Sequence, residues 1–151
     1  VPLARPVPSL LARARSVTPG MTTEQPALTA AGWLERLAQL AVRQGVHISS
    51  LQQKDGRDLE LVLATASLFF PADRLLDERG ANTVLKEFLS TAGAMLDTDH
   101  VELRRWLVDT GFVRRTDFGS DYRRGTLPSW LEEAAGTLGP RQLADAALHL
   151  G

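Results

Sequence analysis

The chain has 151 residues, of which 44% are hydrophobic, and a net charge of −1 at neutral pH. This size fits one domain of about 100 residues with appendages. The near-zero charge excludes a general basic field that would drive non-specific nucleic-acid binding. Cysteine is absent, which excludes disulfides and thiolate metal sites and favours a reducing cytoplasm. No apolar run approaches the about 18 residues of a membrane span, so we expect no membrane partner.

The first 28 residues form a basic, proline-rich leader. Residues 1–28 hold five of the eight prolines and little periodic apolar pattern, which is typical of disorder. Residues 1–20 contain three arginines and no acidic residue. We interpret residues 1–20 as sequence upstream of a true start at Met21, with an organellar transit peptide as the less favoured alternative.

Two helices are expected before Pro71. Thr29 has the side chain of an N-cap, for a helix that runs to about Gln44 and closes at Gly45. A second helix begins after Asp58, and Pro71 stops it because proline cannot continue a helix. Its sequence, LELVLATASLFF, is apolar almost all round, so we expect it to be the central core helix.

Two further helices precede a short hairpin. Asp77 is expected to cap a helix over about 78–89, and Asp99 to cap one that ends at Gly111. Glu102, three residues after Asp99, can complete a capping box. The segments FVRRT and DYRR then flank the turn-prone letters DFGS, which is the pattern of a β-hairpin.

The remaining sequence predicts two C-terminal helices. Ser129 with Glu132 is expected to cap the first, and Pro140 can start the second. The predicted fold is therefore mainly α-helical with a small β-hairpin, a winged helix-turn-helix with extra N- and C-terminal helices. The chain divides into the leader (1–28), an N-terminal helix and connector (29–57), the winged-helix domain (58–125) and the C-terminal helices (126–151).

Three sequence strings carry a resemblance to a known family. They are Leu103-Arg104-Arg105-Trp106-Leu107-Val108-Asp109 with Gly111 and Phe112, then Asp77-Glu78…Asn82…Leu85…Phe88, and Gly119-Ser120…Tyr122-Arg123. Through these strings, the segment from about Asp58 to Arg124 resembles an uncharacterised bacterial domain family of winged-helix type. Members of that family occur alone or C-terminal to ArsR-like regulators. The resemblance implies DNA binding or an association with a transcriptional regulator.

Four residues are expected to have structural roles. Arg104 falls between two apolar sets on its helix, so we expect a half-buried guanidinium paired with a carboxylate such as Glu78. Trp106 lies on the apolar side of the same helix. Asn82 belongs to the second of the three strings, and we assign it a structural role together with Arg104, Glu78 and Trp106.

The outward face of the same helix carries Glu102, Arg105 and Asp109, whose spacing predicts mutual ion pairs. A self-neutralised face is a poor surface for phosphates, so DNA contact would depend on the helix start and the hairpin. The candidate DNA contacts are Thr98, His100, Arg105, Arg115, Ser120 and Arg123. For the hairpin residues, a solvated and charged sheet edge is an equally good interpretation.

No pattern indicates catalysis. The three histidines are scattered and have no partner at metal-ligand spacing. Nucleophile-elbow, Walker and dinucleotide-binding motifs are missing. We therefore expect no enzyme, no cofactor and no metal.

The leading hypothesis is a small bacterial DNA-binding protein, a transcriptional regulator that contacts double-stranded DNA through the wing and the helix start. The alternative is a non-catalytic protein-interaction or dimerisation module, with a homodimer or another protein as partner. An apolar surface for that partner would come from Trp130, Leu131, Leu138 and Leu143. Packing of these side chains on their own core is the simpler explanation.

Overall fold

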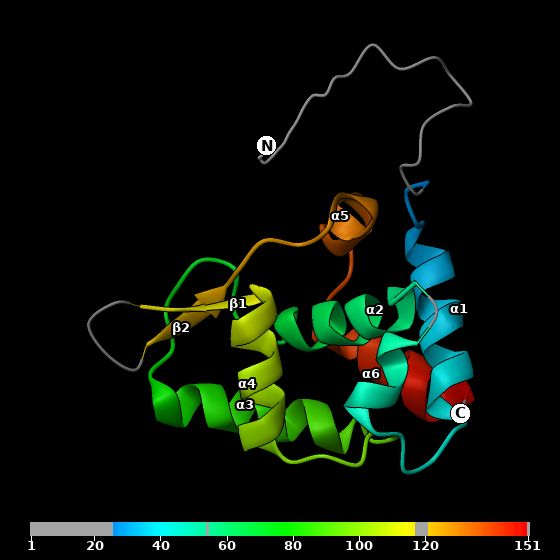
Figure 1. Ribbon diagram of the computed structural model, residues 1–151. Coiled ribbons are helices and arrows are strands. Elements are labelled where there is room, and N and C mark those ends of the chain that lie inside the picture. Colours follow the sequence, from blue (N-terminus) through cyan, green and yellow to red (C-terminus); the bar gives the residue numbers. More distant parts are fainter. Residues whose placement is uncertain (1–25, 54, 117–120, 151) are drawn as a thin grey trace.

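The computed structural model describes residues 26–53, 55–116 and 121–150, so the predicted leader lies largely outside the described residues. The elements run α1 (Ala30–Ala41), η1 (Ile48–Gln52), α2 (Arg57–Ser67), α3 (Glu78–Ser90), α4 (His100–Thr110), β1 (Val113–Arg115), β2 (Tyr122–Arg124), α5 (Ser129–Ala135) and α6 (Pro140–Leu150). The prediction of a mainly helical protein with one small antiparallel hairpin is confirmed. The arrangement is consistent with a winged-helix-like fold, with α1 and α6 side by side and the hairpin at the opposite end (Figure 1).

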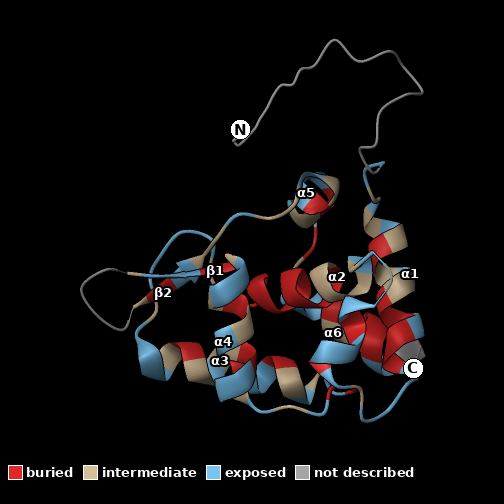
Figure 2. Cartoon of the chain, viewed as in Figure 1, coloured by how far each residue is buried: buried red, intermediate tan, exposed pale blue. Residues whose placement is uncertain are grey.

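Helix α2 is the centre of the core, as its apolar sequence predicts. Every residue from Leu61 to Phe70 is buried (Figure 2). The helix ends at Ser67, however, and not at Pro71. The backbone N–H groups of Phe69 and Phe70 bond three residues back, and such bonds tighten the last turn of a helix and end it.

Side-chain hydrogen bonds join α1 to α2. The indole N–H of Trp33 donates to Thr65 Oγ1 at 3.0 Å, and the Thr65 hydroxyl donates to the Leu61 carbonyl at 2.7 Å. Both side chains are fully buried, so each polar atom needs this partner. Nearer the surface, Arg36 binds Asp58 through two nitrogens, and this hydrogen bonding raises the pKa of Arg36.

The ends of α1 differ in how closely they follow prediction. Thr29 Oγ1 accepts a hydrogen bond from the Gly32 N–H at 3.0 Å, which confirms the N-cap. The helix ends at Ala41, three residues before the expected Gln44. Gly45 has a φ of +69° and lies in the turn beyond the helix, where glycine tolerates this left-handed backbone.

Asp77 and Asp99 cap α3 and α4 as predicted, through bonds of 2.7 and 2.8 Å to the backbone N–H three residues on. Gly111 ends α4 with a φ of +85°, which confirms the left-handed stop. Among the described hydrogen bonds, the Glu102 carboxylate binds the Thr98 hydroxyl and not the Asp99 N–H. The reciprocal half of the predicted capping box is therefore wrong.

The C-terminal helices pack on the same core. Helix α6 begins at Pro140 as predicted, but the N-cap of α5 is Pro128, which gives no side-chain bond, instead of Ser129. The Trp130 indole donates to Glu60 Oε1 at 2.7 Å, which joins α5 to α2. The leucines proposed as an apolar dimer surface, Leu131, Leu138 and Leu143, are buried in the core of the protein. That surface is therefore not available to a partner.

Two sets of bonds fasten the hairpin to the helices. Tyr122 exchanges backbone hydrogen bonds of 2.7 and 2.8 Å with Leu76, in the segment before α3. The Arg124 guanidinium donates to the carbonyls of Phe70 and Leu68, just beyond the end of α2, at 2.8 and 2.9 Å. Burial lowers the pKa of Arg124, but arginine keeps its charge in proteins. A cation therefore satisfies carbonyls at the negative end of the helix dipole.

Thr65→Val is expected to lower the free energy of unfolding by about 1–3 kcal/mol, because the Trp33 indole N–H loses its acceptor in a fully buried site. Thr65→Ser keeps the hydroxyl and should lose only about 1 kcal/mol with the missing methyl group. Urea titration followed by Trp fluorescence measures both. Equal losses in the two variants would mean that the hydrogen bond is not what Thr65 contributes.

Arg124→Ala is expected to cost about 2–3 kcal/mol of unfolding free energy, since two hydrogen bonds from a charged donor are lost. Arg123→Ala is the matched control. Arg123 is the exposed neighbour of Arg124, and its side chain has no hydrogen bond or ion pair among the described residues. The control should stay within about 0.5 kcal/mol of the original protein. A similar loss in both variants would contradict an anchoring role for Arg124.

Candidate nucleic-acid interface

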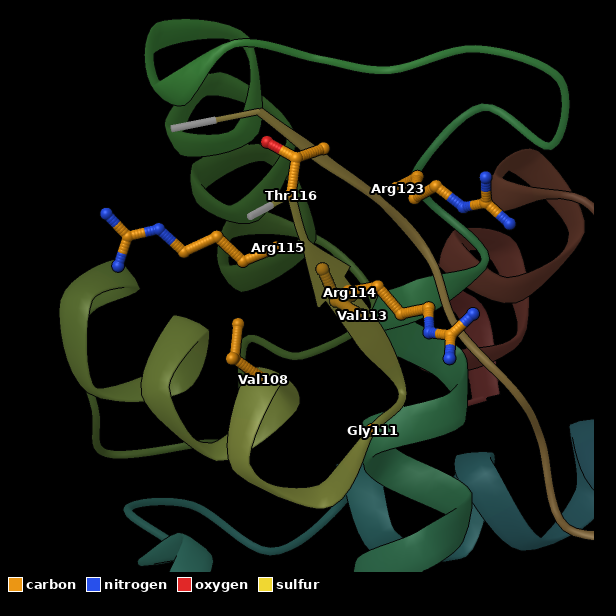
Figure 3. A pocket seen from close by; sticks show the side chains of 7 residues that line it. All are labelled: Val108, Gly111, Val113, Arg114, Arg115, Thr116 and Arg123. Atoms are coloured by element: carbon orange, nitrogen blue, oxygen red, sulfur yellow. The ribbon is translucent and has the colours of Figure 1, made fainter. Parts of the chain in front are cut away.

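The register of the hairpin divides its arginines between two faces. The pairs are Val113 with Arg124, Arg114 with Arg123, and Arg115 with Tyr122. Paired residues in an antiparallel sheet point to the same side. Arg114 and Arg123 are exposed together on one face, whereas Arg115 shares the other face with the buried Tyr122. Figure 3 shows Arg115 pointing away from the other two.

The hairpin and the end of α4 enclose a cavity of about 640 Å³ (Figure 3). It is lined by Val108, Gly111, Val113, Arg114, Arg115, Thr116 and Arg123. Three of these residues carry a positive charge, and none carries a carboxylate. This cavity, which we call the wing cavity, is therefore a basic surface on a protein whose net charge is −1.

The structure changes the set of hairpin candidates. Arg115 and Arg123, proposed together from the sequence, lie on opposite faces, and Arg123 is paired with Arg114 instead. The Thr116 N–H donates to the Asp121 carbonyl at 2.9 Å, directly beyond the paired strand residues. Sequence reasoning left Arg114 out of the candidates, because it did not establish the register that pairs Arg114 with Arg123. Ser120 lies outside the described residues.

Arg104 has a structural partner, but not the expected one. Its Nη1 donates to Asn82 Oδ1 at 2.6 Å, which joins α4 to α3. Glu78 is exposed one turn earlier on α3 and makes no described ion pair with Arg104. The amide oxygen of Asn82 thus takes the place of the predicted carboxylate. Trp106 is half-buried and packs against the core.

The outward face of α4 is not neutralised by the predicted ion pairs. Glu102, Arg105 and Asp109 are all exposed. Within the described ranges, no ion pair of 4.0 Å or less joins Arg105 to a carboxylate. Glu102 is bound to Thr98 at the start of the helix. Arg105 is therefore directly available to an anion, contrary to the expectation from spacing.

The start of α4 is less suited to phosphate than the sequence indicated. Thr98 and His100 are half-buried, and the Thr98 hydroxyl is bonded to the Glu102 carboxylate. The Asp99 carboxylate already accepts a hydrogen bond from the Glu102 N–H, in the first turn of the helix. Negative charge at this end repels a phosphate, so these two candidates do not join the hairpin arginines in one surface.

The described residues contain neither a metal centre nor a membrane-spanning helix. Across residues 26–53, 55–116 and 121–150, no group of three histidine, cysteine or acidic side chains is arranged to hold a metal ion. None of the helices in the described segments is long and apolar enough to cross a bilayer.

The fold and the surface together define a class, a mainly α-helical protein that carries an arginine-rich β-hairpin. A family model described as "uncharacterized protein conserved in bacteria (DUF2087)" matches residues 48–124, and the chain belongs to that family. The match runs from η1 to the end of β2, so it includes the anchored hairpin. No curated protein and no solved structure matches the chain significantly.

Proposed function

We propose that this protein is a small, non-catalytic DNA-binding protein that serves as a bacterial transcriptional regulator in the cytoplasm. The observation that supports it is the pairing of Arg114 with Arg123 on the exposed face of the hairpin. Like charges directly opposite each other destabilise a sheet. The negative charge of a phosphate of double-stranded DNA would offset this repulsion. Each neutralised phosphate also releases counterions, which favours binding.

The wing, and not the start of α4, carries the proposed contact. The wing cavity holds three arginines without a carboxylate, whereas the helix start holds capping carboxylates. The winged-helix type of the family and its association with ArsR-like regulators belong to the same proposal. A hairpin that binds phosphates in this way positions the protein on DNA, while sequence would be read by base contacts.

Arg114→Gln and Arg123→Gln are each expected to weaken binding to a duplex and to lower the salt slope by about one unit, the effect of one lost phosphate contact. Fluorescence anisotropy of labelled promoter and random duplexes, over about 50–300 mM salt, measures both quantities. Arg141→Gln is the matched control, because Arg141 is exposed on α6 and does not line the wing cavity.

Loss of affinity in the two hairpin variants, with the control unchanged, supports DNA binding by the wing. Equal binding by all three variants removes the hairpin from the interface. If the original protein does not bind either duplex at low salt, DNA binding itself is wrong and the interaction module becomes the leading proposal.

One observation favours that second function. The outer side of α1 forms an apolar cavity of about 640 Å³, lined by Ala31, Leu34, Glu35, Ala38, Gln39 and Val42. Val42 is 60% exposed. Exposed apolar patches mark interaction surfaces. A second copy of the chain that packs against this side of α1 would bury the Val42 side chain.

Sedimentation velocity over a range of concentrations tests the dimer. Val42→Lys is expected to shift the distribution towards monomer, because a charge is placed in the apolar interface. Leu75→Lys is the control, as Leu75 is 46% exposed in the segment before α3. A monomer at every concentration would rule out self-association through α1.

A further inference from the structure

A second basic cavity lies between α4 and the hairpin, on the side to which Arg115 points (Figure 3). It has a volume of about 260 Å³ and is lined by Val101, Arg104, Arg105, Val108, Asp109, Arg115 and Tyr122. Pockets for drug-sized ligands occupy about 300–1,000 Å³. This second cavity, the α4–hairpin cavity, therefore fits a small group.

The charge of this cavity selects an anion. Three guanidinium groups face one carboxylate, that of Asp109, which leaves a net charge of +2. In the described part of the chain, Arg105 has no carboxylate within ion-pair distance. Guanidinium groups bind phosphate through two parallel hydrogen bonds, so an anion with several oxygens matches this lining better than chloride does.

The arginines are held in place before any ligand arrives. The Arg104 and Arg115 guanidinium carbons lie 5.6 and 6.0 Å from the ring centroid of Tyr122. Asn82 holds Arg104 from the other helix at 2.6 Å. Tyr122 is 3% exposed and is fixed by two backbone bonds to Leu76. Two cations are thus positioned around one rigid ring, which lowers the entropy lost when they bind a ligand.

We infer that the α4–hairpin cavity binds one phosphate group, through Arg104, Arg105 and Arg115. The group is either a backbone phosphate of nucleic acid or the phosphate of a free small molecule, since both present the same oxygens. The Arg114–Arg123 pair is on the opposite side of the hairpin, whereas Arg115 borders both cavities. Arg105 lines the α4–hairpin cavity and not the wing cavity, whereas Arg114 lines only the wing cavity.

Calorimetry tests the site with a matched pair of variants, Arg105→Gln within the cavity and Arg141→Gln outside both cavities. Inorganic phosphate is titrated into the full chain at low salt, against sodium chloride of equal ionic strength. We expect phosphate to bind with a Kd of about 1 mM, in the range of weak single-group ligands. Arg105→Gln should weaken it about tenfold or more, because a charge-assisted partner is lost. Arg141→Gln should leave it unchanged, because Arg141 is an exposed arginine on α6 that lines neither cavity. Both side chains are exposed, and equal melting temperatures confirm that both variants fold.

The same variants on a DNA duplex separate the two sources. Phosphate binding that Arg105→Gln weakens supports the site whether or not the chain binds DNA, so the inference survives if the proposed function fails. Loss of duplex binding in Arg105→Gln without binding of inorganic phosphate assigns the site to a backbone phosphate. If phosphate does not bind and Arg105→Gln leaves duplex affinity unchanged, the inference is overturned.

Discussion

The bond from Arg124 to the end of α2 is the constraint on which the functional surface depends. Helix α2 is the centre of the core, and the carbonyls of Leu68 and Phe70, just beyond its end, accept both hydrogen bonds of this guanidinium. Because Arg124 is turned inward, the alternation of the two strands turns Arg123 and its partner Arg114 outward. One contact with the core thus decides which face of the hairpin packs against the helices and which face carries the Arg114–Arg123 pair.

The clustered arginines of α4 and the hairpin divide into structural and accessible groups. Arg124 and Arg104 are bonded to other elements of the fold, whereas Arg114 and Arg123 meet solvent on the wing cavity. Arg105 and Arg115 line the α4–hairpin cavity. A protein with almost no net charge can therefore present two local anion sites, because position and not total charge determines the potential at a surface.

Features that depend on a few neighbouring residues could be predicted from the sequence. The caps Thr29, Asp77 and Asp99 act on backbone groups three residues away, so their spacing alone identifies them. The partner of Arg104 is 22 residues distant, and helical periodicity could not choose between Glu78 and Asn82, which share one helix. The predicted pairing of Glu102 with Arg105 was wrong for another reason, since the Glu102 carboxylate binds the Thr98 hydroxyl instead.

The anchoring of the hairpin also has a consequence for the order in which the protein folds. Arg124 lies 56 residues from Leu68 along the chain, whereas α3 and α4 are sequence neighbours that pack directly. Contacts that close long loops lose more chain entropy and form more slowly than local ones. We therefore expect the α3–α4 pair to form before the hairpin docks on the residues that follow α2. Both basic cavities include hairpin residues, so they exist only once the hairpin has docked, and a chain in which it has not docked does not present them.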